Sequence, residues 1–312
     1  MRFVVAAGYG GPEQLVVREG ELPAPGPGRV QVEVRAAGVN PFDAKVYSGA
    51  MGADEARLPL RLGVEAAGVV TAVGDGAAGP AGPVGVGDEV IVHPVSGGYA
   101  SALDVPATSV VPKPATLSWE QAAGLSLIGV TAYHLLEATG VGAGDTVLVH
   151  GVAGGVGLST AQLAIARGAA VVGTAAEHRH EALRGHGVVP VVYGDGLADR
   201  VRAAAPAGID AALDTVGTDE AVDVSLALAP LDRIASVAAF DRGDTGIKLL
   251  GAGPGGDPGT DIRRRARLEV AALAGRGELE VVVAGTFPLD RVADAHRLVL
   301  GGHAGGKVVL LP

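Results

Sequence analysis

The sequence predicts an α/β protein with two domains, an antiparallel β-barrel and a doubly wound parallel sheet. Residues 1–112 contain short β-like runs that Gly and Pro clusters separate. The middle of the chain instead alternates apolar β runs with helical patterns. A glycine-rich turn stands at the first of these strand-to-helix junctions, and the length of 312 residues fits two domains.

The composition excludes several functional classes. The net charge of −10 argues against nucleic acid as the main partner, and the basic run Arg263–Arg267 is expected to be a solvated helix face. The absence of cysteine excludes disulfides, thiolate catalysis and cysteine-ligated zinc. No apolar segment approaches membrane-spanning length, and the N-terminus is typical of a first strand rather than a signal peptide. We therefore expect a cytoplasmic protein with no membrane partner.

The N-terminal part is predicted to form a compact barrel. Val30 to Val34 alternates apolar residues with Gln31 and Glu33, as a half-buried strand does. Strands are expected at Phe3–Ala6, Leu15–Arg18, Val30–Ala36, Ala67–Val73, Glu89–His93 and Tyr99–Val105. Short strands between regular turn signals are typical of antiparallel barrels.

The pattern changes after Pro114. Ser118 and Gln121 have the spacing of a capping box and predict a helix start, and residues 131–139 continue as helix. Alternating strands and helices follow at 146–150, 158–167, 169–174, 180–186, 188–193, 196–204, 209–213, 219–228 and 231–238. Later elements are expected at 262–275, 281–283, 289–300 and 307–311. We expect the last of them to return to the first domain, which would then contain residues 1–112 and 262–312, with residues 113–261 inserted.

The glycine turn predicts a ligand. Gly151, Gly154, Gly155 and Gly157 follow the apolar run at 147–149 and precede a helix and a second strand. Such a unit binds a dinucleotide pyrophosphate, because glycine lets the backbone approach the phosphates and the helix N-terminus presents N–H groups. The usual G-x-G-x-x-G would need glycine at Val152. The alternative is a tight turn without a ligand, but the complete strand–helix–strand unit favours a dinucleotide.

Short motifs along the whole chain resemble one family. They are Gly38–Lys45, Leu62–Val70, Val86–Val90, Leu117–Ala123, Gly129–Tyr133, His150–Gly157, Leu213–Gly217, Ala295–His296 and Gly305–Leu310. In order and spacing they resemble the zinc-independent quinone oxidoreductase branch of the medium-chain dehydrogenases/reductases, which includes enone and alkenal reductases. The resemblance implies a GroES-like catalytic domain (1–112 and 262–312), a Rossmann cofactor domain (113–261), an active site between them, NADPH as hydride donor and a homodimer. The family turn, Gly-x-Ala-Gly-Gly-Val-Gly, also accounts for Val152.

The resemblance shows which positions of this chain would have to bind a catalytic zinc. Zinc-dependent relatives have a cysteine near Asn40 and a His-Glu pair where this chain has Val64 and Glu65. Without cysteine or that histidine, a tetrahedral zinc would lack its soft and imidazole ligands. We expect no zinc, and a structural role for Glu65.

The end of the second Rossmann strand predicts NADP(H). Ala175 stands where NAD-specific proteins carry Asp or Glu, and a guanidinium nearby pairs well with a 2′-phosphate. His178 replaces the arginine that the family often has, with Arg179 next to it; the alternative is that 177–184 is only a charged helix start. The implied cofactor contacts are Asn40, Thr131, Gly151, Ala153, Gly154, Gly155, Val156, Gly157, Thr174, His178, Arg179, Tyr193 and Val216.

The loop at 40–47 supplies the candidate catalytic residues. Hydride addition to an enone or quinone pushes charge onto the carbonyl oxygen, which a donor or cation stabilises. Asn40 could bond that carbonyl or the nicotinamide ribose, Lys45 could hold the ribose or face the enolate, and Tyr47 could reach the same cleft. Alternatively, Asn40 only makes a turn and the other two are solvated. Asp43 is expected to hold the loop.

The expected function is NADPH-dependent reduction of a small-molecule substrate, a quinone or the C=C of an α,β-unsaturated carbonyl. Quinone reductases more often have tyrosine at the position of Lys45, which favours an enone. No His, Asp or Glu stands out as the proton donor, so we expect water or a loosely placed side chain in that role. The alternatives are a crystallin-like NADPH-binding protein with little turnover and a zinc-free alcohol dehydrogenase, which would need a group to take the hydroxyl proton.

Overall fold

The computed structural model describes residues 1–302 and 304–312 and divides the chain into two compact units. Unit 1 contains Met1–Leu127, Arg267–Arg276 and Val281–Pro312, and unit 2 contains Ile128–Ala266 and Gly277–Glu280. Two helices, α2 (Trp119–Thr139) and α7 (Thr260–Gly275), have residues in both units. The divisions expected from the sequence, at 112/113 and 261/262, lie near the starts of these helices.

Unit 1 consists mainly of antiparallel strands. A three-stranded sheet has the order β2-β1-β4, and a seven-stranded sheet has the order β10-β8-β5-β3-β18-β17 with β9 paired to β3. The strands are β1 (Arg2–Ala6), β2 (Leu15–Glu19), β3 (Arg29–Val39), β4 (Leu60–Arg61), β5 (Ala66–Val73), β6 (Ala78–Gly79), β7 (Gly82–Pro83), β8 (Glu89–Val92), β9 (Ala102–Pro106), β10 (Val110–Pro112), β17 (Val283–Pro288) and β18 (Lys307–Leu311). Its shorter helices are α1 (Pro41–Tyr47) and α8 (Val292–Leu300).

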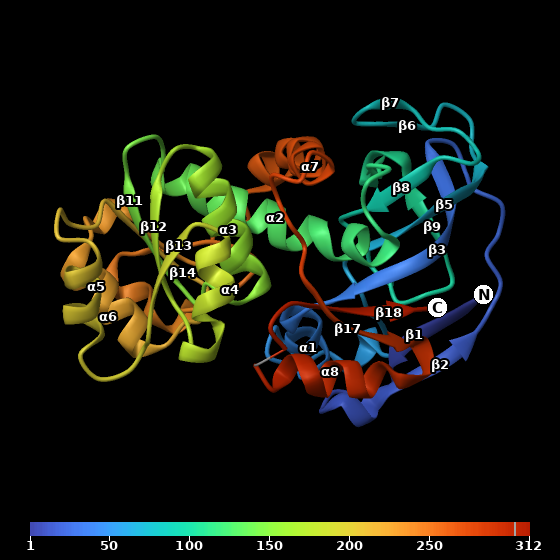
Figure 1. Cartoon of the computed structure of the whole chain (residues 1–312). Coiled ribbons are helices and arrows are strands. Elements are labelled where there is room, and N and C mark those ends of the chain that lie inside the picture. The colour runs from blue at the N-terminus through green and yellow to red at the C-terminus, as the bar shows by residue number, and fades with distance from the viewer. Residues whose placement is uncertain (303) are drawn as a thin grey trace. The chain divides into compact units, whose positions relative to one another are not determined.

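The last strand of the chain lies inside the sheet that the N-terminal segment forms. β18 pairs antiparallel with β3, with Val308 opposite Val39 and Leu310 opposite Ala37 (Figure 1). Val and Ala side chains from β3, β5, β8 and β18 fill the core between them. Each fully buried Val contributes about 1.5 kcal/mol or more, so many small residues replace the scarce aromatic ones. This pairing places Lys307, the first residue of β18, beside the end of β3.

Unit 2 is a six-stranded parallel sheet with the order β13-β12-β11-β14-β15-β16. The strands are β11 (Thr146–His150), β12 (Ala170–Thr174), β13 (Val188–Val191), β14 (Ala211–Asp214), β15 (Ile234–Ser236) and β16 (Lys248–Leu249). Helices α3 (Gly155–Ala166) and α4 (His180–Gly185) lie on one face, and α5 (Leu197–Ala204) and α6 (Asp219–Leu228) on the other (Figure 1). The order reverses between β11 and β14, where ligands of such sheets bind.

The predicted fold class is confirmed: an antiparallel barrel-like unit accompanies a doubly wound parallel sheet. Every strand expected in residues 1–112 has a counterpart, but the expected elements did not include β4, β6, β7, β10, β16 or α1. Short helical turns complete the chain at Pro12–Gln14, Glu55–Arg57, Ala107–Ser109, Glu177–Arg179, Leu231–Arg233, Phe240–Thr245 and Leu289–Arg291. Within the described residues, no helix combines the length and the apolar character needed to cross a membrane.

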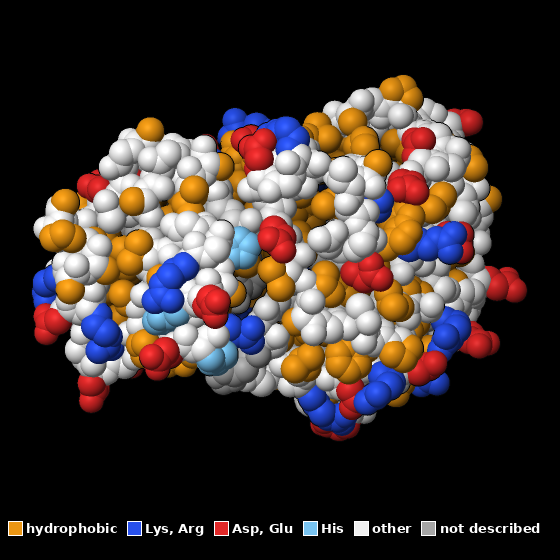
Figure 2. All heavy atoms as spheres, in the orientation of Figure 1, with side chains coloured by type: hydrophobic (Ala, Val, Ile, Leu, Met, Phe, Trp, Pro, Cys, Tyr) orange, Lys and Arg blue, Asp and Glu red, His pale blue; other side chains and the backbone are white. Residues whose placement is uncertain are grey.

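The basic run on α7 is not the uniformly solvated face that the sequence predicts. Arg264 and Arg265 are exposed, and Figure 2 shows basic side chains beside acidic ones where α7 lies. Arg267, however, is 5% exposed, and its Nη1 donates to the carbonyl oxygens of His93 (2.6 Å) and Thr108 (2.9 Å). A guanidinium can be buried when backbone carbonyls satisfy its donors, which residue type alone does not reveal.

Candidate active site

The glycine turn lies at the carboxyl end of β11. Gly151 adopts φ +72°, in the left-handed region that favours glycine. A Cβ on Gly157 would lie 2.2 Å from the carbonyl oxygen of Gly151, so only glycine lets the first turn of α3 pack against the loop. The Gly151 N–H donates to Thr174 Oγ1 (3.0 Å), which ties the turn to the end of β12. The backbone from Gly151 to Gly157 is therefore an open cradle in front of a helix N-terminus, a shape that fits a pyrophosphate.

The end of β14 completes this part of the site. Val216 lies beside the glycine turn, because a Cβ on Gly151 would be 3.1 Å from Val216 Cγ1, and its side chain is 51% exposed. Buried Asp214 accepts hydrogen bonds from the backbone N–H groups of Val216 (2.9 Å) and Gly217 (3.0 Å) and from the Ser236 hydroxyl (2.5 Å). The motif around Val216 was visible in the sequence, but the role of Asp214 in holding it was not.

The predicted 2′-phosphate region follows β12. Ala175 is 4% exposed and its N–H donates to Val191 O (3.0 Å). His178 is exposed and Arg179 is half-buried, both in the helical turn before α4. No acidic side chain therefore occupies the position that binds an unphosphorylated ribose, and a histidine and an arginine follow within one turn.

Tyr193, the predicted adenosine contact, is 51% exposed and follows β13. Arg200 on α5 holds the surrounding segment, donating to the carbonyl oxygens of Val192 (2.8 Å) and Gly194 (2.7 Å) on either side of Tyr193. The sequence analysis missed Arg200, because nothing in its local pattern indicates that its side chain caps a loop.

Thr131 belongs to a polar cluster on α2. The Arg263 guanidinium donates to Thr131 Oγ1 (3.2 Å) and to His134 Nδ1 (3.3 Å). Burial lowers the pKa of His134, and the charge of Arg263 lowers it further, although Asp257 opposes the shift. The His134 ring is therefore neutral, and the Thr131 hydroxyl is bonded to an arginine rather than to its own helix. The expected contact of Thr131 with a nicotinamide remains a prediction.

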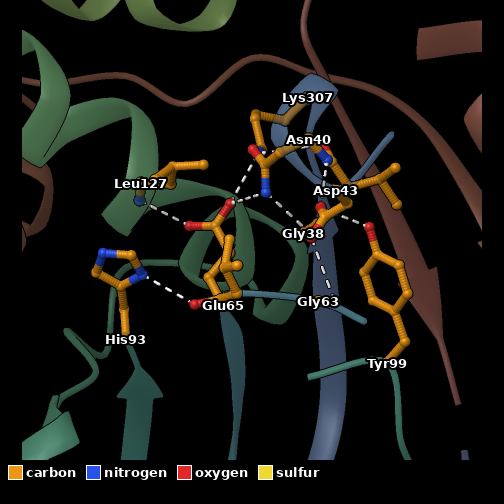
Figure 3. A network of polar contacts seen from close by, with 11 residues as sticks. Gly38, Asn40, Asp43, Gly63, Glu65, His93, Tyr99, Leu127 and Lys307 are labelled. Atoms are coloured by element: carbon orange, nitrogen blue, oxygen red, sulfur yellow. Dashed lines mark hydrogen bonds and ion pairs between the residues drawn. The ribbon is translucent and has the colours of Figure 1, made fainter. Parts of the chain in front are cut away.

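Unit 1 holds a buried polar network around Asn40 (Figure 3). Lys307 Nζ donates to Asn40 Oδ1 (2.5 Å) and Glu65 Oε1 (2.7 Å). Asn40 Nδ2 donates to the same Glu65 oxygen (3.1 Å) and to Gly38 O (3.3 Å), while Glu65 Oε2 accepts from the Leu127 N–H (2.8 Å). Burial would raise the pKa of Glu65, but Lys307 and the other partners lower it below its ordinary range. The network thus contains an ionised Lys–Glu pair that grips the Asn40 amide.

Asp43 fixes the loop on the other side of Asn40. Asn40 precedes α1, and its N–H donates to Asp43 Oδ2 (3.0 Å), while the Asp43 N–H donates to the main-chain carbonyl oxygen of Asn40 (3.0 Å). The Tyr99 hydroxyl donates to the same oxygen (2.7 Å), and the Gly63 N–H donates to Oδ1 (3.3 Å). The expectation that Asp43 holds the loop is confirmed.

The other two loop candidates differ in exposure. Lys45 is exposed on α1. Tyr47 is 1% exposed, and its hydroxyl forms a hydrogen bond with His296 Nδ1 on α8 (3.1 Å). Burial raises the pKa of Tyr47 to about 12 and lowers that of His296 to about 4, so both groups are neutral near pH 7. These contacts give Tyr47 a packing role between α1 and α8, and its catalytic role remains a prediction.

The side chains present do not fit a tetrahedral zinc. The described residues contain no group of three or more metal-binding side chains placed to hold a metal ion. Asn40 and Val64 stand where zinc ligands are expected, and the Glu65 carboxylate already accepts from Lys307, Asn40 and the Leu127 N–H. The chain has no thiolate, and the nearby His93 ring forms a hydrogen bond through Nδ1 with the Val64 carbonyl oxygen (2.9 Å).

Comparisons with known proteins place the chain in a family. An alcohol dehydrogenase GroES-like domain matches residues 26–115, and a model described as zinc-binding dehydrogenase matches residues 186–310. Human quinone oxidoreductase is 31% identical over 328 residues, which cover 100% of this chain and 98% of the human protein. The chain belongs to the medium-chain dehydrogenase/reductase family. Rat synaptic vesicle membrane protein VAT-1 homolog is 30% identical over 345 residues, covering 100% of this chain and 84% of the rat protein.

Solved structures agree with this family membership. Escherichia coli quinone oxidoreductase complexed with NADPH has a TM-score of 0.84 and 27% identity, and the match covers 100% of both chains. An NAD-dependent alcohol dehydrogenase has a TM-score of 0.85 and 27% identity, again over 100% of both chains. The predicted resemblance is confirmed, and the protein is a medium-chain dehydrogenase/reductase of the quinone oxidoreductase and VAT-1 branch. Zinc-binding dehydrogenase is the description of the family that matches residues 186–310. The metal-binding side chains of the described residues in this medium-chain dehydrogenase/reductase do not fit zinc.

Proposed function

We propose that the protein is an NADPH-dependent reductase of a quinone or of the C=C bond of an α,β-unsaturated carbonyl, and that it works without a metal. The observation that carries this proposal is the open glycine cradle at the β11/β14 strand reversal, in a chain that matches quinone oxidoreductases over its full length. When bound, the cofactor supplies a hydride. The protein binds and orients the reactants and stabilises charge.

The cofactor contacts divide into four groups. Gly151, Ala153, Gly154, Gly155, Val156 and Gly157 surround the pyrophosphate, and the N–H groups at the start of α3 face its charge. Thr174 and Val216 border the cradle. His178 and Arg179 bind the 2′-phosphate, and Tyr193 lies along the adenosine. Asn40 and Thr131 contact the nicotinamide side.

The preference for NADP over NAD rests on Ala175 and Arg179. A buried alanine offers no acceptor to a ribose 2′-hydroxyl, whereas a guanidinium offers several donors to a phosphate. The structural similarity to an NAD-dependent alcohol dehydrogenase shows that the fold itself does not decide the cofactor.

The proposed catalytic residues remain Asn40, Lys45 and Tyr47. Exposed Lys45 is the cation that can approach a developing negative charge on a carbonyl oxygen. The hydrogen bond of Tyr47 with His296 holds α1, the helix that carries Lys45, in place. Tyr47 would therefore support the charge stabilisation by Lys45 through the position of this helix. We also propose a homodimer, which sedimentation velocity would detect.

A second candidate is an NADPH-binding protein with little turnover. It is favoured by a relative at 30% identity that is named for a vesicle membrane and not for a reaction. Both candidates share the cofactor site and differ in turnover. A zinc-free alcohol dehydrogenase is less well supported, because that reaction needs a group to take the hydroxyl proton and the sequence singles out none for this task.

The decisive experiment measures NADPH oxidation with quinones, alkyl vinyl ketones, alkenals and enoyl thioesters, and repeats each assay with NADH. We expect turnover with at least one enone or quinone and a lower KM for NADPH than for NADH. Oxidation with quinones alone would reject the enone substrate class. Tight NADPH binding without oxidation across the panel would favour the second candidate, and absence of NADPH binding would overturn both.

A further inference from the structure

The orientation of the Asn40 amide follows from its neighbours. An ammonium group has donors and no acceptor, so the Asn40 atom 2.5 Å from Lys307 Nζ must be the oxygen Oδ1. An ionised carboxylate only accepts, so the atom 3.1 Å from Glu65 Oε1 must be the nitrogen Nδ2. Figure 3 shows Lys307 and Glu65 beside the Asn40 amide. A flipped amide would place two donors against each other and two acceptors against each other.

A count of valences then limits what Asn40 can offer a ligand. Nδ2 has two hydrogens, and they go to Glu65 Oε1 and Gly38 O. Oδ1 has two lone pairs, and Lys307 takes one of them. The side chain therefore has no N–H left, and it keeps a single acceptor position.

A contribution to folding stability does not explain why this chain buries the Lys307–Glu65 ion pair. The side chains of Lys307 and Glu65 are 5% and 0% exposed, and a buried ion pair is often no more stabilising than apolar residues of the same volume. The pair also requires glycine around it. A Cβ on Gly38 would lie 2.5 Å from Glu65 Oε1, and a Cβ on Gly124 would lie 3.1 Å from Lys307 Cγ. What the pair secures is the direction of one amide group.

We propose that Lys307 and Glu65 are positioning residues that present Asn40 to the bound cofactor only as a hydrogen-bond acceptor. This inference rests on the proposed function and narrows it. The group that Asn40 receives is a donor, a ribose hydroxyl or the carboxamide N–H of the nicotinamide nucleoside. A substrate carbonyl also only accepts, so Asn40 does not stabilise its developing charge, and that task falls to Lys45.

The first test removes the Lys307–Glu65 pair that holds the Asn40 amide and keeps the net charge of the protein. The double variant Lys307→Met/Glu65→Gln leaves the Asn40 amide free to turn. We expect the Kd for NADPH, measured by calorimetry without substrate, to rise about tenfold or more, as for the loss of a hydrogen bond in a charged network. The matched control is Lys113→Met/Glu89→Gln, another Lys–Glu pair of unit 1 with 3.0 Å between its charged atoms and no contact with Asn40. Its Kd should stay within about twofold of wild type.

The second test separates acceptor from donor. The double variant Asn40→Asp/Glu65→Gln moves the carboxylate from position 65 to position 40, so the cluster keeps its total charge and Lys307 keeps an anionic partner. Position 40 then has acceptors and no N–H. We expect this variant to bind NADPH about tenfold more tightly than Asn40→Ala, which has neither. If Lys307→Met/Glu65→Gln does not fold, this comparison still tests whether Asn40 acts as a hydrogen-bond acceptor.

Each outcome bears on the inference. Circular dichroism establishes which variants are folded. An unchanged NADPH Kd in folded Lys307→Met/Glu65→Gln, or equally weak binding by Asn40→Asp/Glu65→Gln and Asn40→Ala, would overturn it. Failure of the proposed function appears elsewhere, in a wild-type protein that binds no NADPH or reduces nothing on the panel. A protein that binds NADPH without turnover still answers the question about Asn40.

Discussion

Asp43 is a residue whose ionisation the fold controls. It is 1% exposed, and burial raises its pKa to about 6, although the hydrogen bonds from Tyr99 and Asn40 and the charge of Lys307 oppose that shift. The loop that carries Asn40 thus depends on a carboxyl group that changes charge close to physiological pH. This property could not be predicted from the sequence, because Tyr99 and Gly63 reach Asp43 only in the folded chain.

The raised pKa predicts a pH-dependent stability. Between about pH 4 and pH 6, folded Asp43 keeps a proton that the unfolded chain has released, so the stability it contributes is full below about pH 4 and is lost as the pH rises through about 6. The loss is on the order of 3 kcal/mol. Urea unfolding of wild type and Asp43→Asn across this range should show the wild-type advantage shrinking as pH rises. A pH-independent difference would contradict the prediction.

Arg179 is the residue on which the proposed choice of NADP depends. Replacing it with alanine removes a guanidinium from the 2′-phosphate region, so we expect the Kd for NADPH to rise about tenfold while the Kd for NADH stays nearly constant. Arg184→Ala is the control, because it removes an exposed arginine from the following helix, α4. Equal effects of Arg179→Ala on both cofactors would contradict a phosphate-binding role.

At the scale of elements, the junction of β11 and α3 is the most constrained. Gly157→Ala would push a methyl group against the Gly151 carbonyl, which costs about 1–3 kcal/mol of overpacking and deforms the cradle. We expect the Gly157→Ala variant to have a lower melting temperature and a higher Kd for NADPH than wild type. Gly185, in α4, has open space around its Cβ position, so Gly185→Ala should be neutral or stabilising by up to about 1 kcal/mol. Two variants with the same effect would show that helix propensity, and not the close approach, governs this site.

The elements that sequence could predict are those that local pattern defines. The alternation of apolar and polar residues predicted β3, and the spacing of the glycines predicted the turn before α3. Both predictions depend only on residues that are close together in the sequence. Lys307 lies in the motif Gly305–Leu310, but nothing in that motif indicates the role of its side chain. Its role comes from the pairing of β18 with β3, which joins residues hundreds of positions apart. For the same reason the burial of Tyr47 against His296 could not be read from the loop that contains Tyr47.

At the scale of the whole molecule, the donor set predicts indifference to chelators. Dialysis against 1,10-phenanthroline should leave both NADPH turnover and the melting temperature unchanged, since the side chains around Glu65 do not fit zinc. A zinc-dependent alcohol dehydrogenase treated in parallel is the positive control and should lose activity. Loss of activity here, restored by added zinc, would show that a metal binds elsewhere in the chain.

The order of Asn40, Glu65 and Lys307 along the chain has a consequence for synthesis. Asn40 and Glu65 leave the ribosome before residues 128–266, and the strand that carries Lys307 leaves it after them. Until then β3 has an open edge where β18 will pair, and the Glu65 carboxylate has no cation. Residues 128–266 emerge as one continuous piece and can form their parallel sheet meanwhile. The unit that is translated first is therefore completed last, and a chain that stalls before residue 307 exposes an unfinished sheet edge to chaperones and proteases.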